Sequence, residues 1–288
     1  MRFGAHSQMF VHDIAEDVEG VFETIASYGL DAIEIHVGDA REFPVERVTS
    51  AAHRTGLEVV VGTALRADQS TVSDDPRVRQ RGVDHLRRCI EIADAVGARI
   101  VAGGVHSANG TFAGRGRTDE EWDRSVEALR SAAEDATDAD VTLTVEPVSR
   151  YSGYFLNTAA DAVALVDAVG SSHVAVQLDT FHMNIEEPDP VAAIEAVGAR
   201  LRHVHAVENT RGVPGTGQVP WSAIFEALDR AGYEGLFVYE HFPITLREMA
   251  VRTHTWRSIA SSEEVCLEGT RRLRALAGGL THDGSPAR

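Results

Sequence analysis

The chain has 288 residues, a formal net charge of −17 and 27 basic residues, all of them arginine. A surface this negative repels phosphate backbones and anionic lipid, which excludes nucleic acid and membranes as preferred partners. No apolar run is long enough to span a bilayer, and the N-terminus lacks a signal-peptide pattern, so we expect a cytoplasmic protein. The two cysteines, Cys89 and Cys266, stand alone in helix-like segments and are predicted to be core residues without a disulfide.

Short apolar runs alternate with longer amphipathic runs along the chain. The apolar runs predict strands over residues 3–6, 32–37, 58–62, 99–104, 142–146, 175–179, 201–206 and 235–239. Apolar residues at three-and-four spacing predict helices over 16–28, 45–55, 78–96, 120–136, 159–169, 190–197 and 221–231, and a last long segment over 246–276.

This alternation predicts an α/β fold, a single-domain (β/α)8 TIM barrel over residues 1–277 with a fraying tail over 278–288. A doubly wound open sheet is the alternative. It is disfavoured because no glycine-rich phosphate-binding turn follows the early strands.

Metal-capable side chains stand at the ends of four successive predicted strands, where barrel enzymes place their active sites. These residues are Glu146, Asp179, His205 and Glu240, with Glu208 just beyond the seventh strand. Each residue alone fits a solvated rim or a satisfied core position, but four together favour a site. A buried carboxylate such as Glu146 must be paired or metal-bound, since an isolated buried charge is costly. One imidazole and three carboxylates favour Mn²⁺, Mg²⁺ or Co²⁺ over a thiolate-type zinc site.

Four sequence blocks resemble one family. Residues 179–187, DTFHMNIEE, are similar to the motif of the tagatose/psicose (allulose) 3-epimerases, which belong to the xylose isomerase-like superfamily. The blocks EPVSRY (146–151), HVHAVENTRGVPGTG (203–217) and YEHF (239–242) resemble the fifth-, seventh- and eighth-strand motifs of that family. The resemblance covers roughly the second half of the chain. In the first half it extends only to the βα rhythm and the acidic second strand that contains Glu34.

The resemblance implies a ketose 3-epimerase that acts on free keto sugars with one divalent ion per chain, Mn²⁺ first and Mg²⁺ or Co²⁺ as alternatives. It makes Glu146, Asp179, His205 and Glu240 the metal ligands, and Glu146 and Glu240 also the acid/base pair. The metal would hold O2 and O3 of the sugar and stabilise the cis-enediolate formed when the C3 proton leaves. Reprotonation from the other face inverts C3, which requires two bases flanking one carbon. Members of the family are commonly homodimers or homotetramers, and we expect the same here.

The resemblance also makes His182 and Arg211 substrate contacts. His6 and Phe242 are further candidates for the substrate pocket, with rim solvation or packing as the alternative reading of each. The family usually has a glutamate after the Arg-Tyr pair of the fifth-strand motif, whereas this chain has Ser152 there. We therefore treat Ser152 as a substrate-contact candidate that leaves the identity of the sugar open.

One histidine of the seventh strand is predicted to support the site from below. His203 precedes His205 by two residues, so both side chains share one face of the strand. His203 lies one layer deeper and is predicted to be a supporting or core residue, with metal ligation as the alternative.

Three other functions stay open at this stage. An aldose–ketose isomerase of the same superfamily would use the same metal and glutamates to move a proton between C1 and C2. A lyase is a more distant enzyme alternative, and a non-catalytic sugar-binding barrel is the alternative from another class. The metal-dependent endonucleases that share this barrel are disfavoured by the net charge of −17. The absence of a glycine-rich anion loop after strands seven and eight favours non-phosphorylated substrates.

Overall fold

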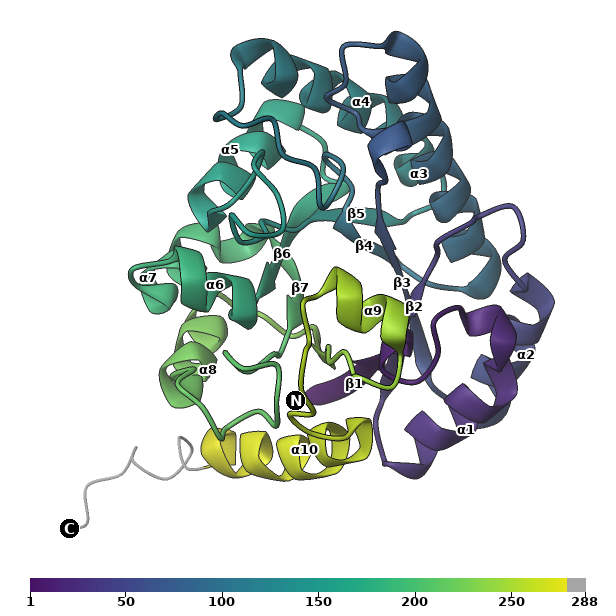
Figure 1. Cartoon of the computed structure of the whole chain (residues 1–288), viewed down its shortest axis with the longest axis vertical. Helices are drawn as coiled ribbons and strands as arrows, with labels where there is room; N and C mark the ends of the chain where they lie inside the picture. The colour runs from purple at the N-terminus through teal and green to yellow at the C-terminus, as the bar shows by residue number, and fades with distance from the viewer. Residues whose placement is uncertain (279–288) are drawn as a thin grey trace.

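The computed structural model describes residues 1–278, which form a closed barrel of eight parallel strands in sequence order (Figure 1). The strands are β1 (Arg2–His6), β2 (Ala32–His36), β3 (Glu58–Ala64), β4 (Ile100–Gly104), β5 (Thr142–Val145), β6 (Val174–Asp179), β7 (Leu201–His205) and β8 (Leu236–Tyr239). β1 pairs with both β2 and β8, which closes the barrel. The predicted (β/α)8 barrel is therefore confirmed, and the open-sheet alternative is wrong.

Helices surround the barrel on the outside (Figure 1). They are α1 (Val18–Ser27), α2 (Val45–Thr55), α3 (Pro76–Val96), α4 (Asp119–Asp138), α5 (Ala159–Val169), α7 (Pro190–Val197), α8 (Trp221–Arg230) and α10 (Ser262–Gly278). Short 3-10 turns are η1 (Ser7–Met9), η2 (Ile14–Glu16), η3 (Ala67–Gln69) and η4 (Gly198–Arg200). Within residues 1–278, none of the helices combines the length and the apolar character that crossing a bilayer requires.

Two segments differ from the prediction, and both lie near the candidate site. A loop was expected after the sixth strand, but helix α6 (Thr180–Glu186) begins there because Asp179 Oδ1 accepts the backbone N–H of Phe181 at 2.7 Å. The last predicted segment is two helices, α9 (Arg247–Arg252) and α10, and not one. His254 adopts a left-handed φ of 56° between them, which an α-helix cannot contain. Helix α9 consequently lies in front of the barrel in Figure 1.

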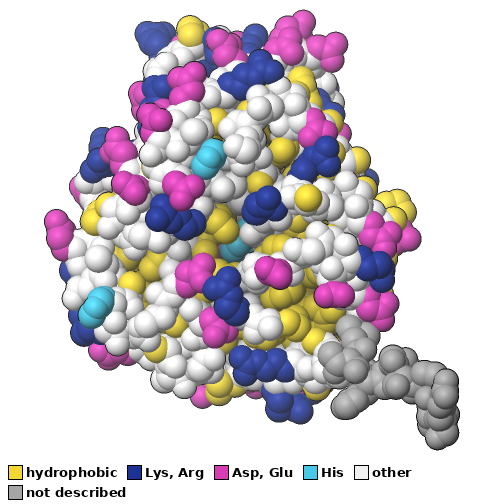
Figure 2. All heavy atoms as spheres, turned by 180° about the vertical axis from the view of Figure 1, so that it is seen from behind, with side chains coloured by type: hydrophobic (Ala, Val, Ile, Leu, Met, Phe, Trp, Pro, Cys, Tyr) yellow, Lys and Arg dark blue, Asp and Glu magenta, His cyan; other side chains and the backbone are white. Residues whose placement is uncertain are grey.

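The main hydrophobic core joins the strands to the helices that surround them. Phe3 on β1 and Tyr239 on β8 stack at 5.7 Å where the barrel closes. Cys89 and Cys266 are buried and free, as predicted. On the face turned away in Figure 1, arginines lie singly or in small groups among acidic side chains (Figure 2). The predicted fraying tail lies outside the described residues, apart from Gly278, which ends α10.

Candidate active site

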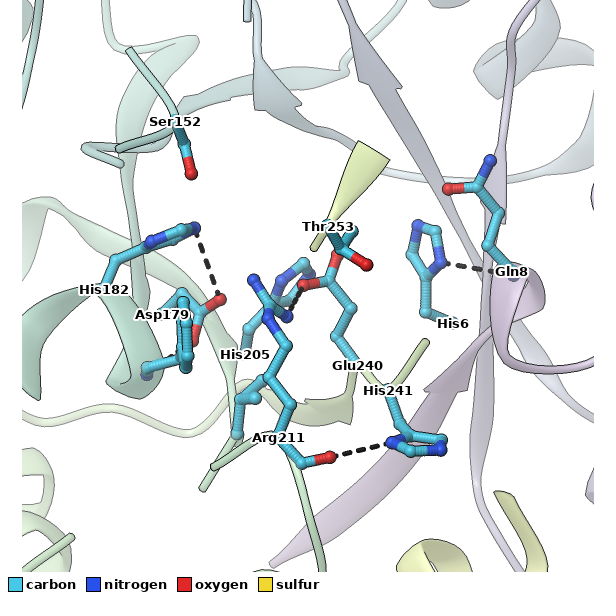
Figure 3. Close-up of polar contacts among 12 residues, drawn as sticks. His6, Gln8, Ser152, Asp179, His182, His205, Arg211, Glu240, His241 and Thr253 are labelled. Carbon is cyan, nitrogen blue, oxygen red and sulfur yellow. Dashed lines mark hydrogen bonds and ion pairs between the residues drawn. The ribbon is translucent and has the colours of Figure 1, made fainter. Parts of the chain in front are cut away.

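The structure brings the four predicted metal-capable residues together at one rim of the barrel, and Figure 3 labels three of them, Asp179, His205 and Glu240. Asp179, His205 and Glu240 offer ligand atoms within 4.8 Å of one another. Glu146 and His182 form a second such group with the same Asp179. His205 Nδ1 also lies 3.7 Å from Glu146 Oε1, which links the two groups. Residues from four successive strands therefore surround one small volume.

Two buried atoms of this cluster have no hydrogen-bond partner within residues 1–278. They are Asp179 Oδ2 and His205 Nδ1, and both point into the cluster. Buried polar atoms are almost always hydrogen-bonded, so unpaired ones at a functional rim indicate a missing ligand. An acceptor oxygen and a ring nitrogen beside two further carboxylates form an oxygen-rich donor set for a hard divalent cation. The residues present therefore fit the metal ion that the sequence predicted.

The cluster carries more negative than positive charge, and its pKa values reflect this. Burial raises the pKa of Glu146 to about 8, and the charges of Asp179 and Glu240 add to the rise against the opposing effect of His205. Burial likewise raises the pKa of Asp179 to about 6, although Arg211 acts in the opposite direction. Crowded carboxylates of this kind are stabilised by a bound cation.

Among residues 1–278, Arg211 is the arginine that contacts the cluster directly. Its guanidinium forms an ion pair with Glu240 and packs over the rings of Phe181 and Phe242, at 4.1 and 4.9 Å from their centroids. Burial works to raise the pKa of Glu240, but the charges of Arg211 and His205 outweigh it and lower that pKa to about 2. Phe242 thus lines the cavity and also packs against Arg211. Both alternatives that the sequence left open for Phe242, a pocket residue and a packing residue, therefore apply.

His182 and Ser152 lie together on one side of the site, opposite His6 (Figure 3). His182 Nδ1 accepts the backbone N–H of Ser149 at 3.1 Å, so its Nε2 carries the proton and faces Asp179 Oδ2 at 3.8 Å. Burial, with the charge of Arg211, lowers the pKa of His182 to about 3 and keeps this ring neutral. All the predicted substrate-contact candidates line a single cavity of about 570 Å³ together with Glu146 and Glu240.

Glu34 on β2 contacts the cluster, although the sequence analysis did not single it out as a site residue. Its carboxylate oxygen Oε2 lies 2.7 Å from His203 Nε2 and 3.0 Å from His205 Nε2, and Oε1 lies 3.8 Å from His6 Nε2. This contact holds the His205 ring with Nδ1 toward Glu146. A Cβ at Gly62 on β3 would stand 2.6 Å from Glu34 Oε1, so only glycine leaves room for this side chain.

His203 occupies the deeper layer that was predicted for it, since it is fully buried against Glu34. Glu34, His203 and His205 themselves offer ligand atoms within 4.8 Å, so the ligand alternative for His203 stays open. The signal for Glu34 in the sequence is a single acid within an apolar strand, which resembles many rim residues.

Three other polar residues of the strand ends do not join the cluster. Glu208 is fully buried, and its carboxylate accepts N–H groups of residues 209, 215, 219 and Trp221, so it anchors the loop that carries Arg211. Glu208, which the sequence places just beyond the seventh strand, thus stabilises this loop and belongs to none of the metal-capable groups within residues 1–278. His241 lies 2.7 Å from the Arg211 carbonyl through Nδ1, and His106 packs against Phe155 at 5.8 Å.

Comparisons with known proteins agree with this geometry. The family model of the xylose isomerase-like TIM barrel matches residues 22–265. An L-ribulose 3-epimerase of Mesorhizobium japonicum is 33% identical over 261 residues, which cover 90% of this chain and 88% of that protein. A D-psicose 3-epimerase of Enterocloster bolteae is 30% identical over 90% of this chain and 88% of its own length.

Solved structures give the same result. A Methylomonas sp. D-allulose 3-epimerase in complex with D-allulose superposes with a TM-score of 0.91 at 26% identity, covering 96% of both chains. A structure of L-ribulose 3-epimerase gives a TM-score of 0.89 at 31% identity over 99% of both chains. The chain therefore belongs to the xylose isomerase-like TIM barrel family, in which it groups with the 3-epimerases of ketoses and is an enzyme of the isomerase class.

Proposed function

We propose that this protein is a divalent-metal-dependent ketose 3-epimerase that acts on free keto sugars. The observation that carries the proposal is the pairing of Glu146 and Glu240 in one cavity. These residues follow β5 and β8, and the strands between them contribute Asp179 and His205. Two carboxylates on either side of one bound carbon are what inversion through removal and return of a proton requires.

Each carboxylate has a separate support within the chain. Glu240 is held by Arg211, which aims one oxygen of that carboxylate and adds positive charge beside a bound sugar. Glu146 Oε1 lies 3.7 Å from His205 Nδ1, and Glu146 shares a group of metal-capable atoms with Asp179. In the reaction, one carboxylate oxygen takes the C3 proton, and the other carboxyl group returns a proton to the opposite face, which leaves the epimer. The neutral His182 ring donates from Nε2 toward the sugar hydroxyls.

The proposed metal is Mn²⁺, held by Glu146, Asp179, His205 and Glu240, with Mg²⁺ or Co²⁺ as alternatives. When bound, such an ion polarises the sugar carbonyl as a Lewis acid and makes the neighbouring C–H more acidic. The unpaired Asp179 Oδ2 and His205 Nδ1 support this assignment. A cytoplasmic location and a homodimer or homotetramer remain predictions.

The test is a panel of keto and aldo sugars incubated with the Mn²⁺-loaded protein in D₂O. We expect ketose epimers in the chromatogram and deuterium at C3 of the product. Deuterium at C1 or C2 with an aldose product would instead indicate the aldose–ketose isomerase. Binding of sugars without any product would indicate the sugar-binding barrel.

Single substitutions test the acid/base roles of the two carboxylates, Glu146 and Glu240. Glu240→Gln and Glu146→Gln should each reduce epimerisation by at least about a hundredfold, the usual share of one general acid or base. Each variant keeps one base, so C3 exchange in D₂O should persist for only one of the two epimers, and for opposite epimers in the two variants. Glu195→Gln, which removes a carboxylate paired with Arg230 on the outer surface, is the matched control and should leave turnover unchanged. Full activity of Glu240→Gln would refute the proposal.

A further inference from the structure

A second cavity of about 530 Å³ adjoins the candidate active site. Five residues line both cavities, and these are Gln8, His36, Ala64, Asn109 and Arg252. They come from η1, the ends of β2 and β3, the segment after β4, and α9. The cavity of about 570 Å³ at the cluster already exceeds the lower limit for drug-sized ligands, so the joined volume has room for more than the reacting part of a sugar.

Three of these shared residues have polar ends with no oxygen or nitrogen hydrogen-bond partner among residues 1–278. The side-chain amide of Asn109 and the ring of His36 have no hydrogen-bond partner within residues 1–278, although both side chains are half-buried. The guanidinium of Arg252 contacts only Met249 Sδ at 4.0 Å, and no carboxylate within residues 1–278 lies within 4.0 Å of it. We call His36, Asn109 and Arg252 the junction residues.

The acids of the second cavity are already paired. Asp39 forms an ion pair with Arg41 at 2.6 Å, and Asp13 accepts the backbone N–H of Ala15 at 2.9 Å. The other arginine of this cavity, Arg66, donates to the Gly38 carbonyl at 2.8 Å and lies 3.6 Å from Asp68. Arg252, which is exposed, therefore brings to the junction a positive charge that forms no ion pair within residues 1–278, in a chain whose net charge is −17.

His36 reaches the junction from the His6 side of the site, whereas Asn109 reaches it from the Ser152 side, since the N–H of Gly110 donates to the Ser152 carbonyl at 2.8 Å. The ring of His205 is 6.3 Å from that of His6, and the ring of His6 is 6.0 Å from that of His36. Figure 3 shows His6 and Gln8 on one side of Glu240, and His182 and Ser152 on the other. A sugar whose C3 lies between the two glutamates can therefore extend past His6 and bring its far end to the junction residues.

We propose that the junction residues bind a carboxylate at the end of the substrate remote from its carbonyl, so that the substrate is a keto sugar acid. The proposal rests on the proposed function and specifies its substrate class. A planar guanidinium matches a carboxylate with two parallel N–H groups, and the Asn109 amide supplies a further donor. One arginine balances one carboxylate, whereas a phosphate brings about −1.5 to −2 charges at pH 7.

The test compares three substrates with the same keto frame and different groups at C6: D-fructose, D-fructuronate and D-fructose 6-phosphate. With Mn²⁺-loaded protein, kcat/KM for C3 epimerisation should favour fructuronate over fructose by about tenfold to a hundredfold, the usual value of a charge-assisted hydrogen-bonded pair. Arg252→Gln should bring the two substrates to within about twofold of each other. Arg247→Gln removes the same charge from α9 at a residue that lines neither cavity, and it should keep the preference.

A binding measurement separates this proposal from the proposed function. Calorimetric titration of fructuronate into Mn²⁺-loaded Glu240→Gln protein should show a Kd about tenfold or more lower than in the double variant that adds Arg252→Gln. If Arg252 strengthens fructuronate binding in this way but the native protein does not turn the sugar over, the epimerase proposal is refuted and the proposed carboxylate-binding site is supported. Equal affinities, equal use of fructose and fructuronate by the native protein, or a preference for fructose 6-phosphate would each overturn the carboxylate site.

Discussion

Replacement of Glu34 by glutamine tests whether the contacts beneath the cluster set the metal affinity. The Glu34 carboxylate accepts from two buried imidazoles, at 2.7 Å from His203 Nε2 and 3.0 Å from His205 Nε2. Both N–H groups reach the same oxygen, Oε2, so a glutamine of the same size keeps both contacts when its carbonyl oxygen takes that place. The acceptor is then neutral instead of charged, and the NH₂ group takes the place of Oε1, which lies 3.8 Å from His6 Nε2. The variant therefore weakens the two hydrogen bonds that orient His203 and His205.

Two magnitudes follow from this geometry. Exchange of a charged acceptor for a neutral one weakens each of the two hydrogen bonds by about 1 kcal/mol, so the free energy of unfolding should fall by about 1–2 kcal/mol. Loss of a carboxylate that orients a metal-binding histidine lowers metal affinity by about tenfold to a hundredfold. Both effects should appear in Glu34→Gln, because Glu34 is only 1% exposed and solvent cannot compensate for the lost charge.

The assays are urea unfolding of the metal-free protein and titration with Mn²⁺ followed by the EPR signal of the free ion. Glu58→Gln on the neighbouring strand is the matched control, since the Glu58 side chain is 47% exposed and pairs with Arg2 at the surface. This control should change neither quantity by a measurable amount. Native-like Mn²⁺ affinity in Glu34→Gln, at an unchanged unfolding midpoint, would refute the reasoning.

Three further predictions concern the same site. Gly62→Ala places a methyl group 2.6 Å from Glu34 Oε1, so it should weaken Mn²⁺ binding in the same titration, and unchanged binding would contradict that close contact. The folded metal-free protein holds a proton on Glu146 up to about pH 8, whereas the unfolded chain loses it near 4.5, so the free energy of unfolding should fall as the pH rises through this window. Mn²⁺ binding at pH 7 should then release protons, measured calorimetrically in buffers of different ionisation enthalpy, and Glu146→Gln should release about one fewer. Glu208→Gln should lower the free energy of unfolding by about 1–3 kcal/mol and reduce turnover through Arg211; a native unfolding curve would show that the loop does not depend on this carboxylate.

The sequence by itself determined the barrel and the rim of the site. Strand and helix periods are local properties, and a polar residue that closes an apolar strand is visible without any tertiary information. Glu146, Asp179, His205 and Glu240 were found in this way, because parallel strands of a barrel all end at one rim. Local patterns were less informative after β6 and β8. There a side-chain cap at Asp179 and a left-handed residue at His254 set the helix boundaries.

Only the tertiary structure decided which side chains meet across the barrel. Glu34 and His203 are separated by 169 positions in the chain, and closure of the barrel places them in contact. The convergence of Asn109 and Arg252 on the active-site cavity likewise joins segments far apart in sequence. The physical reason is that periodicity specifies the face on which a residue lies, whereas the partner of a buried charge depends on how strands from both ends of the chain pack around one axis.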